Sequence, residues 1–123
     1  MNVALLLSGG NGTRLGADIP KQYIEVKGMP VLAYSLRTFL ELKQIDAVQI
    51  VAEEKWQNYI RKVCFKYDIK QKIKGFSNPG ENRQLSIWNG LNDIRKYAAG
   101  NSVIIVHDAA RPGVSSLLLK EGL

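Results

Sequence analysis

An uninterrupted apolar run near the N-terminus places the strongest constraint on the fold. Residues 3–7 carry no polar side chain, and Ser8, Gly9 and Gly10 follow at once. A short apolar run bounded by turn residues is typical of a strand that is buried on both faces, as in the parallel sheet of an α/β protein. The chain is therefore expected to begin with a central strand that leads directly into a glycine-rich loop.

Strand and helix patterns alternate along the rest of the chain. Apolar residues show helical spacing in residues 30–43, 56–64 and 85–97. Strand patterns are found at residues 47–52, 69–73 and 103–106. Residues 75–82 have the composition of a loop, and Trp56, Cys64 and Trp88 lie on apolar helical stripes and are interpreted as packing residues. This alternation predicts parallel βαβ units and an α/β fold in a chain of 123 residues, the size of one domain.

The charge balance indicates an anionic partner of small size. The formal net charge is +6, but the basic residues are spread along the chain and show no zinc-finger or RNA-binding pattern. A small phosphorylated ligand is therefore expected, and neither nucleic acid nor a membrane is expected as a partner. The single cysteine excludes an internal disulfide, which suits a reducing cytoplasm.

The loop after the first strand has the composition of a phosphate-binding segment. Residues 9–16 contain four glycines and Arg14, and Lys21 follows Pro20 a few positions later. Glycines let backbone amides approach phosphate oxygens closely, and the two cations add positive charge. The spacing fits neither the P-loop, which needs a Gly-Lys pair, nor the dinucleotide fingerprint, because its last glycine comes one residue too late. A nicotinamide-dependent oxidoreductase is therefore disfavoured.

A second polar position follows the last predicted strand. Asp108 comes at the end of that apolar run, and ligands in α/β folds bind beyond the carboxyl ends of the strands. We therefore expect Asp108 to lie near the glycine-rich loop. The preceding residue, His107, should point to the opposite face of the sheet, because side chains alternate along a strand, and we expect it to be structural.

Three motifs occur along the chain in a specific order. They are LSGGNGTRLG at residues 7–16 with IPKQY at 19–23, NRQLSIWNGL at 82–91, and VHDAARP at 106–112. Together they resemble the signature of the 2-C-methyl-D-erythritol 4-phosphate cytidylyltransferases and their ribitol-5-phosphate cytidylyltransferase relatives. The resemblance reaches to about residue 114 and implies a Rossmann-like nucleotidyltransferase fold with a mostly parallel sheet.

The resemblance also implies a reaction. An enzyme of this kind transfers CMP from CTP to a polyol phosphate and releases pyrophosphate, with Mg²⁺ as cofactor. The expected acceptor is 2-C-methyl-D-erythritol 4-phosphate, of the isoprenoid precursor pathway. The alternatives are ribitol 5-phosphate as the acceptor, or a truncated remnant without activity.

The motifs carry roles over to nine residues. The resemblance makes Arg14 and Lys21 the catalytic cations, which would stabilise the negative charge that builds up during phosphoryl transfer. It makes Asp108 the Mg²⁺ ligand, although an aspartate after a strand can also cap the next helix. The nucleotide-binding residues it implies are Ser8, Gly9, Gly10, Gly12, Arg83 and Ser86. Arg111 could contact phosphate or pair with Asp108, and both readings stay open.

The resemblance covers only part of the family's length, which is about twice that of this chain. Residues 1–123 are thus expected to be the N-terminal, CTP-binding part of a single nucleotidyltransferase domain whose C-terminal half is absent. On its own this part is expected to be weakly active or inactive. A homodimer is expected of full-length members but not of this segment.

Overall fold

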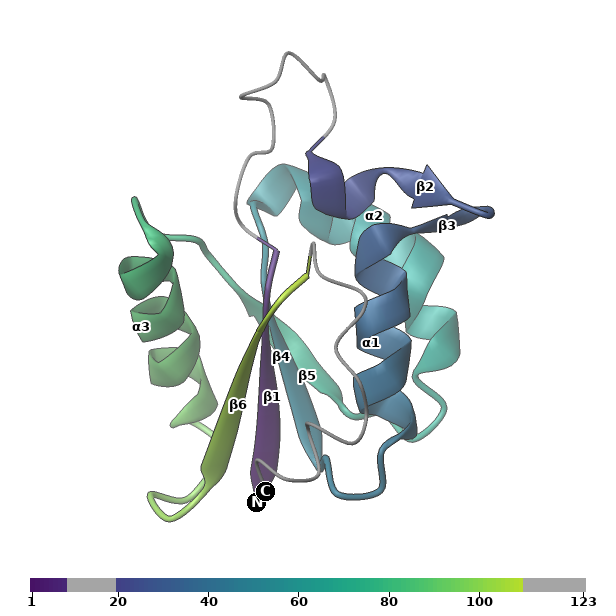
Figure 1. Ribbon diagram of the computed structural model, residues 1–123. Coiled ribbons are helices and arrows are strands. Elements are labelled where there is room, and N and C mark those ends of the chain that lie inside the picture. The colour runs from purple at the N-terminus through teal and green to yellow at the C-terminus, as the bar shows by residue number, and fades with distance from the viewer. Residues whose placement is uncertain (9–19, 110–123) are drawn as a thin grey trace.

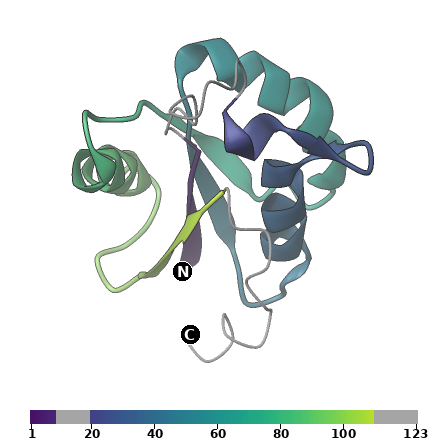
Figure 2. The same ribbon diagram turned by 45° about the horizontal axis from the view of Figure 1, so that its top comes forward.

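A four-stranded parallel sheet forms the centre of the computed structural model, which describes residues 1–8 and 20–109. The strand order is β5-β4-β1-β6, and every neighbouring pair is parallel. The strands are β1 (Asn2–Leu7), β4 (Ala47–Val51), β5 (Ile73–Ser77) and β6 (Val103–Asp108). Helices α1 (Val31–Glu41) and α2 (Glu54–Cys64) cover one face, and α3 (Arg83–Ile94) covers the other (Figures 1 and 2). The three layers confirm the α/β class.

Burial on both faces explains the apolar sequence of β1. The side chains of Ala4 and Leu6 pack with α1 and α2, and those of Val3, Leu5 and Leu7 pack on the side of α3. A strand covered by helices on both faces has no solvent-facing positions, so its sequence does not alternate. The first strand is thus confirmed as a central element.

All three predicted helices are present, with ends that differ by up to three residues from the predicted ranges. Pro30 precedes α1 with φ of −63°, which suits the start of a helix, and the apolar stripe of α1 is buried. Helix α3 approaches the sheet closely at Gly90, where an added Cβ would lie 2.5 Å from Leu5 Cδ1. None of the described helices is long and apolar enough to cross a bilayer.

The third strand lies later in the chain than expected. Residues 69–72 form a turn instead of a strand, and Ile69 is 89% exposed. The turn forms because the Asp68 carboxylate accepts hydrogen bonds from the backbone N–H groups of Lys72 (2.7 Å) and Ile73 (2.9 Å). The predicted strand at 69–73 is therefore wrong, and the predicted loop at 75–82 begins only after Ser77.

Two short features were not expected from the sequence. A hairpin joins β2 (Glu25–Val26) and β3 (Met29–Pro30), with Lys27 and Gly28 in the left-handed region at φ of 54° and 83°. Single-turn 3₁₀ helices occur at η2 (Lys21–Tyr23) and η3 (Phe65–Tyr67). Of these features, η2 carries Lys21, one of the two cations that the motifs imply for catalysis.

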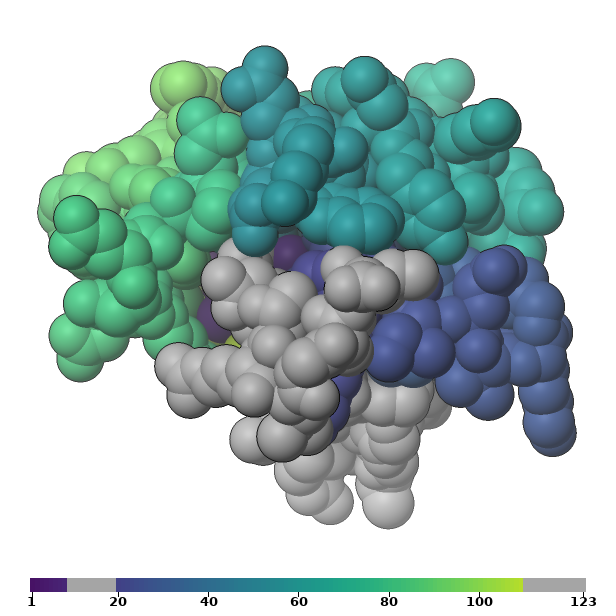
Figure 3. Space-filling model, turned by 90° about the horizontal axis from the view of Figure 1, so that it is seen from above, coloured from purple at the N-terminus to yellow at the C-terminus, as the bar shows by residue number. Residues whose placement is uncertain are grey.

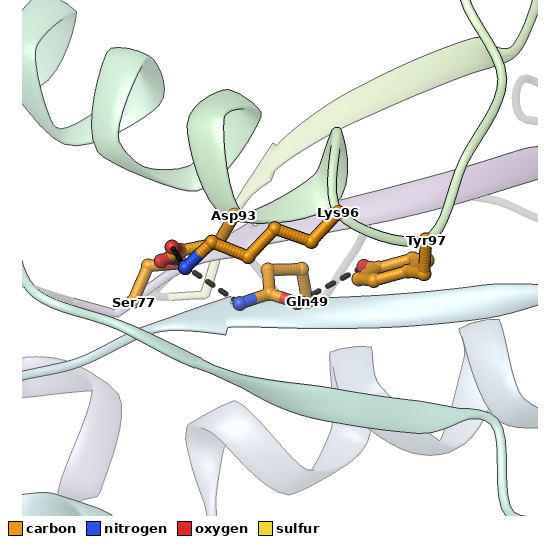
Figure 4. A network of polar contacts seen from close by, with 5 residues as sticks. All are labelled: Gln49, Ser77, Asp93, Lys96 and Tyr97. Carbon is orange, nitrogen blue, oxygen red and sulfur yellow. Dashed lines mark hydrogen bonds and ion pairs between the residues drawn. The ribbon is translucent and has the colours of Figure 1, made fainter.

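A polar network fastens the C-terminal end of α3 to the sheet (Figure 4). Gln49 in β4 is only 2% exposed, and its Nε2 donates to Ser77 Oγ at 2.8 Å. The Ser77 hydroxyl donates to Asp93 Oδ2 at 2.6 Å, and the Tyr97 hydroxyl donates to Gln49 Oε1 at 2.9 Å. Lys96 Nζ completes the network at 3.1 Å from Asp93 Oδ1. A buried amide is tolerated here because both of its ends are satisfied.

Candidate active site

The polar residues expected to converge lie at the same edge of the sheet. Leu7, the last residue of β1, is in register with Asp108 of β6 on one side and with Val51 of β4 on the other. Ser8 follows Leu7, and its N–H donates to the Val51 carbonyl at 2.7 Å. The end of β1 and the Asp108 carboxylate are therefore neighbours at the carboxyl edge, as the sequence predicts.

Asp108 faces α3 and makes an ion pair with its first residue. Arg83 Nε lies 3.4 Å from Asp108 Oδ1, and the two side chains are 58% and 33% exposed. The adjacent His107 points the other way, where its Nε2 lies 3.1 Å from Ser35 Oγ and its ring meets the edge of Phe39. This confirms that the two side chains occupy opposite faces, and the contacts of His107 agree with a structural role.

The loop before α3 is folded back onto the helix by Ser86. The Ser86 Oγ accepts the N–H of Gly80 at 3.0 Å, and the Asn82 side chain caps the helix by accepting the N–H of Leu85 at 2.8 Å. A Cβ at Gly80 would lie 2.3 Å from Leu85 Cβ, so only glycine fits there. Gly80 was not identified from the sequence. Its position between a proline and the capping residue Asn82 is the feature that could have identified it.

Lys21 is held at this edge by its neighbours in η2. Pro20, Gln22 and Tyr23 are buried, whereas Lys21 is exposed. Gln22 Nε2 donates to the Ser8 carbonyl at 3.0 Å, which links η2 to the end of β1. Lys21 is thus exposed to solvent, while the residues on both sides of it, Pro20 and Gln22, are buried.

The aromatic and cysteine assignments have mixed outcomes. Trp56 packs as predicted, with its ring stacked on that of Tyr23. Cys64 is fully buried as predicted, and burial raises its pKa to about 12. Trp88 was expected to pack in the core, but it is 53% exposed and lies beside the Arg95 guanidinium, so this prediction is wrong.

The segments that carry these residues surround the carboxyl ends of the strands. Seen from above, α3, α2 and the η2 segment lie around this end of the sheet (Figure 3). Of the nine predicted site residues, the structure brings five to this edge: Ser8, Lys21, Arg83, Ser86 and Asp108. Gly9, Gly10, Gly12 and Arg14 lie outside the described residues.

Comparison with known families agrees with this arrangement. The family model described as "IspD: 2-C-methyl-D-erythritol 4-phosphate cytidylyltransferase" matches residues 2–122. The chain belongs to this family. IspD membership accounts for the parallel sheet and for the order of the three motifs.

Individual IspD relatives span a longer chain. Ribitol-5-phosphate cytidylyltransferase of Vibrio parahaemolyticus is 43% identical over all of this chain, which covers 52% of that protein. The chloroplastic 2-C-methyl-D-erythritol 4-phosphate cytidylyltransferase of Oryza sativa is 39% identical over 97% of this chain and 38% of its own length. The crystal structure of 4-diphosphocytidyl-2C-methyl-D-erythritol synthase from Anaerococcus prevotii superposes with a TM-score of 0.76 at 29% identity, over 98% of this chain and 48% of that one. The chain therefore spans between 38% and 52% of the length of these relatives.

The acidic residues of this IspD-family chain do not form a metal cage in the part that the structure describes. No group of three or more histidine, cysteine or carboxylate side chains gathers there. Asp108, the carboxylate that the motifs imply as metal ligand, is partly exposed at the strand end.

Proposed function

We propose that this chain binds CTP and is part of an enzyme that transfers CMP from CTP to a polyol phosphate, releasing pyrophosphate. The observation that carries the proposal is that one end of β1, at the carboxyl edge of the sheet, joins the two groups: η2, which bears Lys21, is bonded to Ser8, and the preceding residue Leu7 is in register with Asp108, the partner of Arg83. Such an edge is where ligands of α/β proteins bind. Family membership supplies the reaction class.

The proposed reaction needs cations rather than a protein nucleophile. A phosphate oxygen of the polyol phosphate attacks the α-phosphorus of CTP. A new oxygen–phosphorus bond forms while the bond from the α-phosphorus to the oxygen bridging the β-phosphate breaks, and pyrophosphate leaves. Lys21 and Arg14 would stabilise the charge that builds up on the phosphate oxygens, because fixed cations need not reorganise during the step.

The remaining predicted residues would hold the nucleotide. The amides of Gly9, Gly10 and Gly12 would contact the phosphates, following Ser8 at the end of β1. Arg83 and Ser86 would contact the nucleotide from the first turns of α3. The hydrogen bond between Ser86 and the Gly80 amide supports this role, because it fixes the loop before α3 in one conformation. A fixed loop costs less ordering free energy when a ligand binds.

The chemistry of Asp108 fits Mg²⁺. Magnesium binds through one or two carboxylates plus phosphate oxygens and water, so a single aspartate at the rim of a phosphate site suffices. The Asp108 carboxylate is partly exposed and already forms an ion pair with a cation, the guanidinium of Arg83. When bound, Mg²⁺ would neutralise part of the charge on the triphosphate. Asp108 would supply the ligand, and Arg83 would orient it.

We propose 2-C-methyl-D-erythritol 4-phosphate as the acceptor, in isoprenoid precursor synthesis, because the family model carries that activity in its description. Ribitol 5-phosphate is the second candidate, because the relative from Vibrio parahaemolyticus is 43% identical over the whole chain. Parallel assays with the two polyol phosphates would separate them.

We further propose that residues 1–123 form the N-terminal part of a longer nucleotidyltransferase domain. Among the described residues β6 pairs with β1 alone, and it exposes Val103 and Val106. An edge strand with exposed valines is suited to pairing with a further strand. As part of a longer domain, the chain alone would bind CTP but turn it over weakly.

The lone, fully buried cysteine suits a reducing cytoplasm, where we propose the protein acts.

Two measurements test the proposed function. With Mg²⁺ and CTP at about 100 times its dissociation constant, the folded chain should gain about 2.7 kcal/mol of stability, and GTP should give less. Lys21→Ala should remove most of this gain, whereas Lys43→Ala, at the opposite end of the sheet, should retain it. Absence of any Mg²⁺-dependent protection by CTP would contradict the proposal. A pyrophosphate-release assay with each polyol phosphate then measures turnover.

A further inference from the structure

Ser8 and Tyr23 are joined by two hydrogen bonds although 15 residues separate them in sequence. The Ser8 hydroxyl donates to the Tyr23 hydroxyl oxygen at 2.8 Å, and the Tyr23 hydroxyl donates to the Ser8 carbonyl at 3.0 Å. Gln22 Nε2 donates to the same carbonyl. Burial raises the pKa of Tyr23 to about 12, so the phenol stays protonated and remains a donor at any physiological pH. These bonds are shielded from water, because all three residues are buried.

The Tyr23 ring is fixed from its other side by α2. It stacks on Trp56 with ring centroids 4.0 Å apart and planes inclined by 13°. Tyr59 meets both rings edge-on, at 6.0 Å from Tyr23 and 5.5 Å from Trp56. Stacked and edge-on pairs of this kind stabilise a packing arrangement beyond the area that they bury. Tyr23 therefore connects β1 to α2 through one side chain.

These contacts of Tyr23 and Gln22 fix the position of the Lys21 backbone. Lys21 lies between buried Pro20 and buried Gln22 in η2, so its Cα cannot move without disturbing the Ser8 and Trp56 contacts. We propose that Gln22, Tyr23 and Trp56 are positioning residues, which hold Lys21 at the carboxyl edge before the nucleotide arrives. The functional meaning of this inference rests on the proposed role of Lys21 as a phosphate-binding cation.

Holding Lys21 in place before binding also affects affinity. The bonds from Gln22 and Tyr23 to the Ser8 carbonyl fix η2 in one position. A binding group that is already ordered loses less conformational entropy when the ligand arrives. Loss of the anchoring bonds should thus weaken triphosphate binding even when the chain remains folded.

A matched pair of tyrosine variants tests the inference. Tyr23→Phe keeps the ring and its stacking but removes the hydroxyl. Tyr97→Phe is the control, because its partly buried hydroxyl also donates to an oxygen, that of Gln49, and burial also raises its pKa to about 12. Tyr97 packs with the α3 face of the sheet, away from η2. Tyr23→Phe removes two hydrogen bonds and Tyr97→Phe removes one, so urea unfolding of both variants is measured first, and binding and cleavage are compared under conditions where both are fully folded.

The two readouts are CTP affinity and local proteolysis. With Mg²⁺ present, Tyr23→Phe should bind CTP about tenfold more weakly than Tyr97→Phe, and trypsin should cleave after Lys21 about tenfold faster. A tenfold change corresponds to about 1.4 kcal/mol, the size expected for lost buried hydrogen bonds. Calorimetry measures the first readout, and mass spectrometry of the cleavage products measures the second.

The outcomes separate this inference from the proposed function. If Tyr23→Phe equals Tyr97→Phe in the cleavage rate after Lys21, the positioning role is wrong. If the wild-type chain binds no CTP, the proposed function fails, and cleavage alone decides whether Lys21 is held by these contacts. Should Tyr23→Phe not fold, Trp56→Phe, which retains a smaller stacking ring, is expected to show an intermediate increase in cleavage. An unchanged rate in that variant also contradicts the inference.

Discussion

The Asp108 carboxylate lies 3.4 Å from the guanidinium of Arg83, which begins α3 on the neighbouring side of the site. The pair connects the last residue of β6 to the first residue of α3. Both side chains are partly exposed, and pairs of that kind contribute little to folding. The pair is therefore expected to contribute little to the free energy of unfolding, which makes its residues suitable for testing binding.

Replacing Asp108 by asparagine should separate binding from folding. We expect Asp108→Asn to change the free energy of unfolding by less than about 1 kcal/mol, because the pair is exposed. The same variant should lose the Mg²⁺-dependent part of the protection by CTP. Thermal unfolding with CTP, with and without Mg²⁺, measures this. Glu41→Gln breaks another surface pair, with Arg37, and should leave the protection intact. Full protection in Asp108→Asn would exclude this carboxylate as the metal ligand.

The close approach of α3 to β1 predicts a cost for any side chain at position 90. In Gly90→Ala the new Cβ would meet Leu5 Cδ1, Cδ2 and Cγ at 2.5, 3.0 and 3.3 Å, inside a packed core. We expect a net destabilisation of about 1–3 kcal/mol, even though alanine favours the helix. Urea unfolding measures it. Gly100→Ala is the control, because nothing lies within 4 Å of its added Cβ, and it should be neutral or slightly stabilising. Equal stability of the two variants would refute the packing argument.

The polar network of Figure 4 predicts an acid-sensitive part of the stability. The hydrogen bond from Ser77, with help from Lys96, holds the pKa of Asp93 below its ordinary value of 3.8. A lowered pKa in the folded state stabilises the fold above the ordinary pKa, and this stability is lost as the pH falls through the lowered value. We therefore expect wild type to exceed Asp93→Asn in stability at pH 7, with the difference shrinking below about pH 4.

Urea unfolding of both proteins between pH 3 and 7 checks this expectation. Ser77→Ala keeps the Asp93 carboxylate but removes the donor that contributes most to the shift. Its stability should therefore depend less on pH in the acidic range than that of wild type. A difference between wild type and Asp93→Asn that stays constant down to pH 3 would contradict the assignment.

Burial of Cys64 predicts an unreactive thiol. Its pKa is raised to about 12 by burial, so the thiolate is scarce at pH 8, and the side chain is fully shielded. A disulfide-exchange reagent should react with the native chain only as fast as the chain opens, and immediately in urea. Absorbance of the released thiol follows the reaction. Reaction of the native chain at the rate of an exposed cysteine would overturn this expectation.

The sequence predicted which residues meet at the carboxyl ends of the strands, because this inference needs only local patterns. Parallel strands of similar length end together, so an apolar run ending at Leu7 and another ending near Asp108 were expected to meet. Strand alternation likewise placed His107 and Asp108 on opposite faces. Such inferences need only the period of the strand and the direction of the sheet.

The features that escaped prediction depend on side-chain contacts and packing that the hydrophobic pattern does not encode. The start of β5 was misplaced because the Asp68 carboxylate captures two backbone N–H groups and delays the strand. Trp88 lies on an apolar stripe, yet α3 turns that side outward. The stacking of Tyr23 on Trp56 joins residues from two separate elements, and no local pattern marks it.

The hydrogen bonds that lead from Tyr97 to Asp93 in Figure 4 all run in one direction. The Tyr97 phenol donates to Gln49, the Gln49 amide donates to Ser77, and the Ser77 hydroxyl donates to Asp93, a carboxylate that can only accept. The Gln49 amide therefore has a preferred orientation, because turning it over would place its oxygen against the Ser77 hydroxyl, whose proton is donated to Asp93. Gln49 also adjoins the register shift between β4 and β5. The hydrogen bond from Gln49 to Ser77 thus ties β4 to β5 beside that shift and favours one register of the two strands.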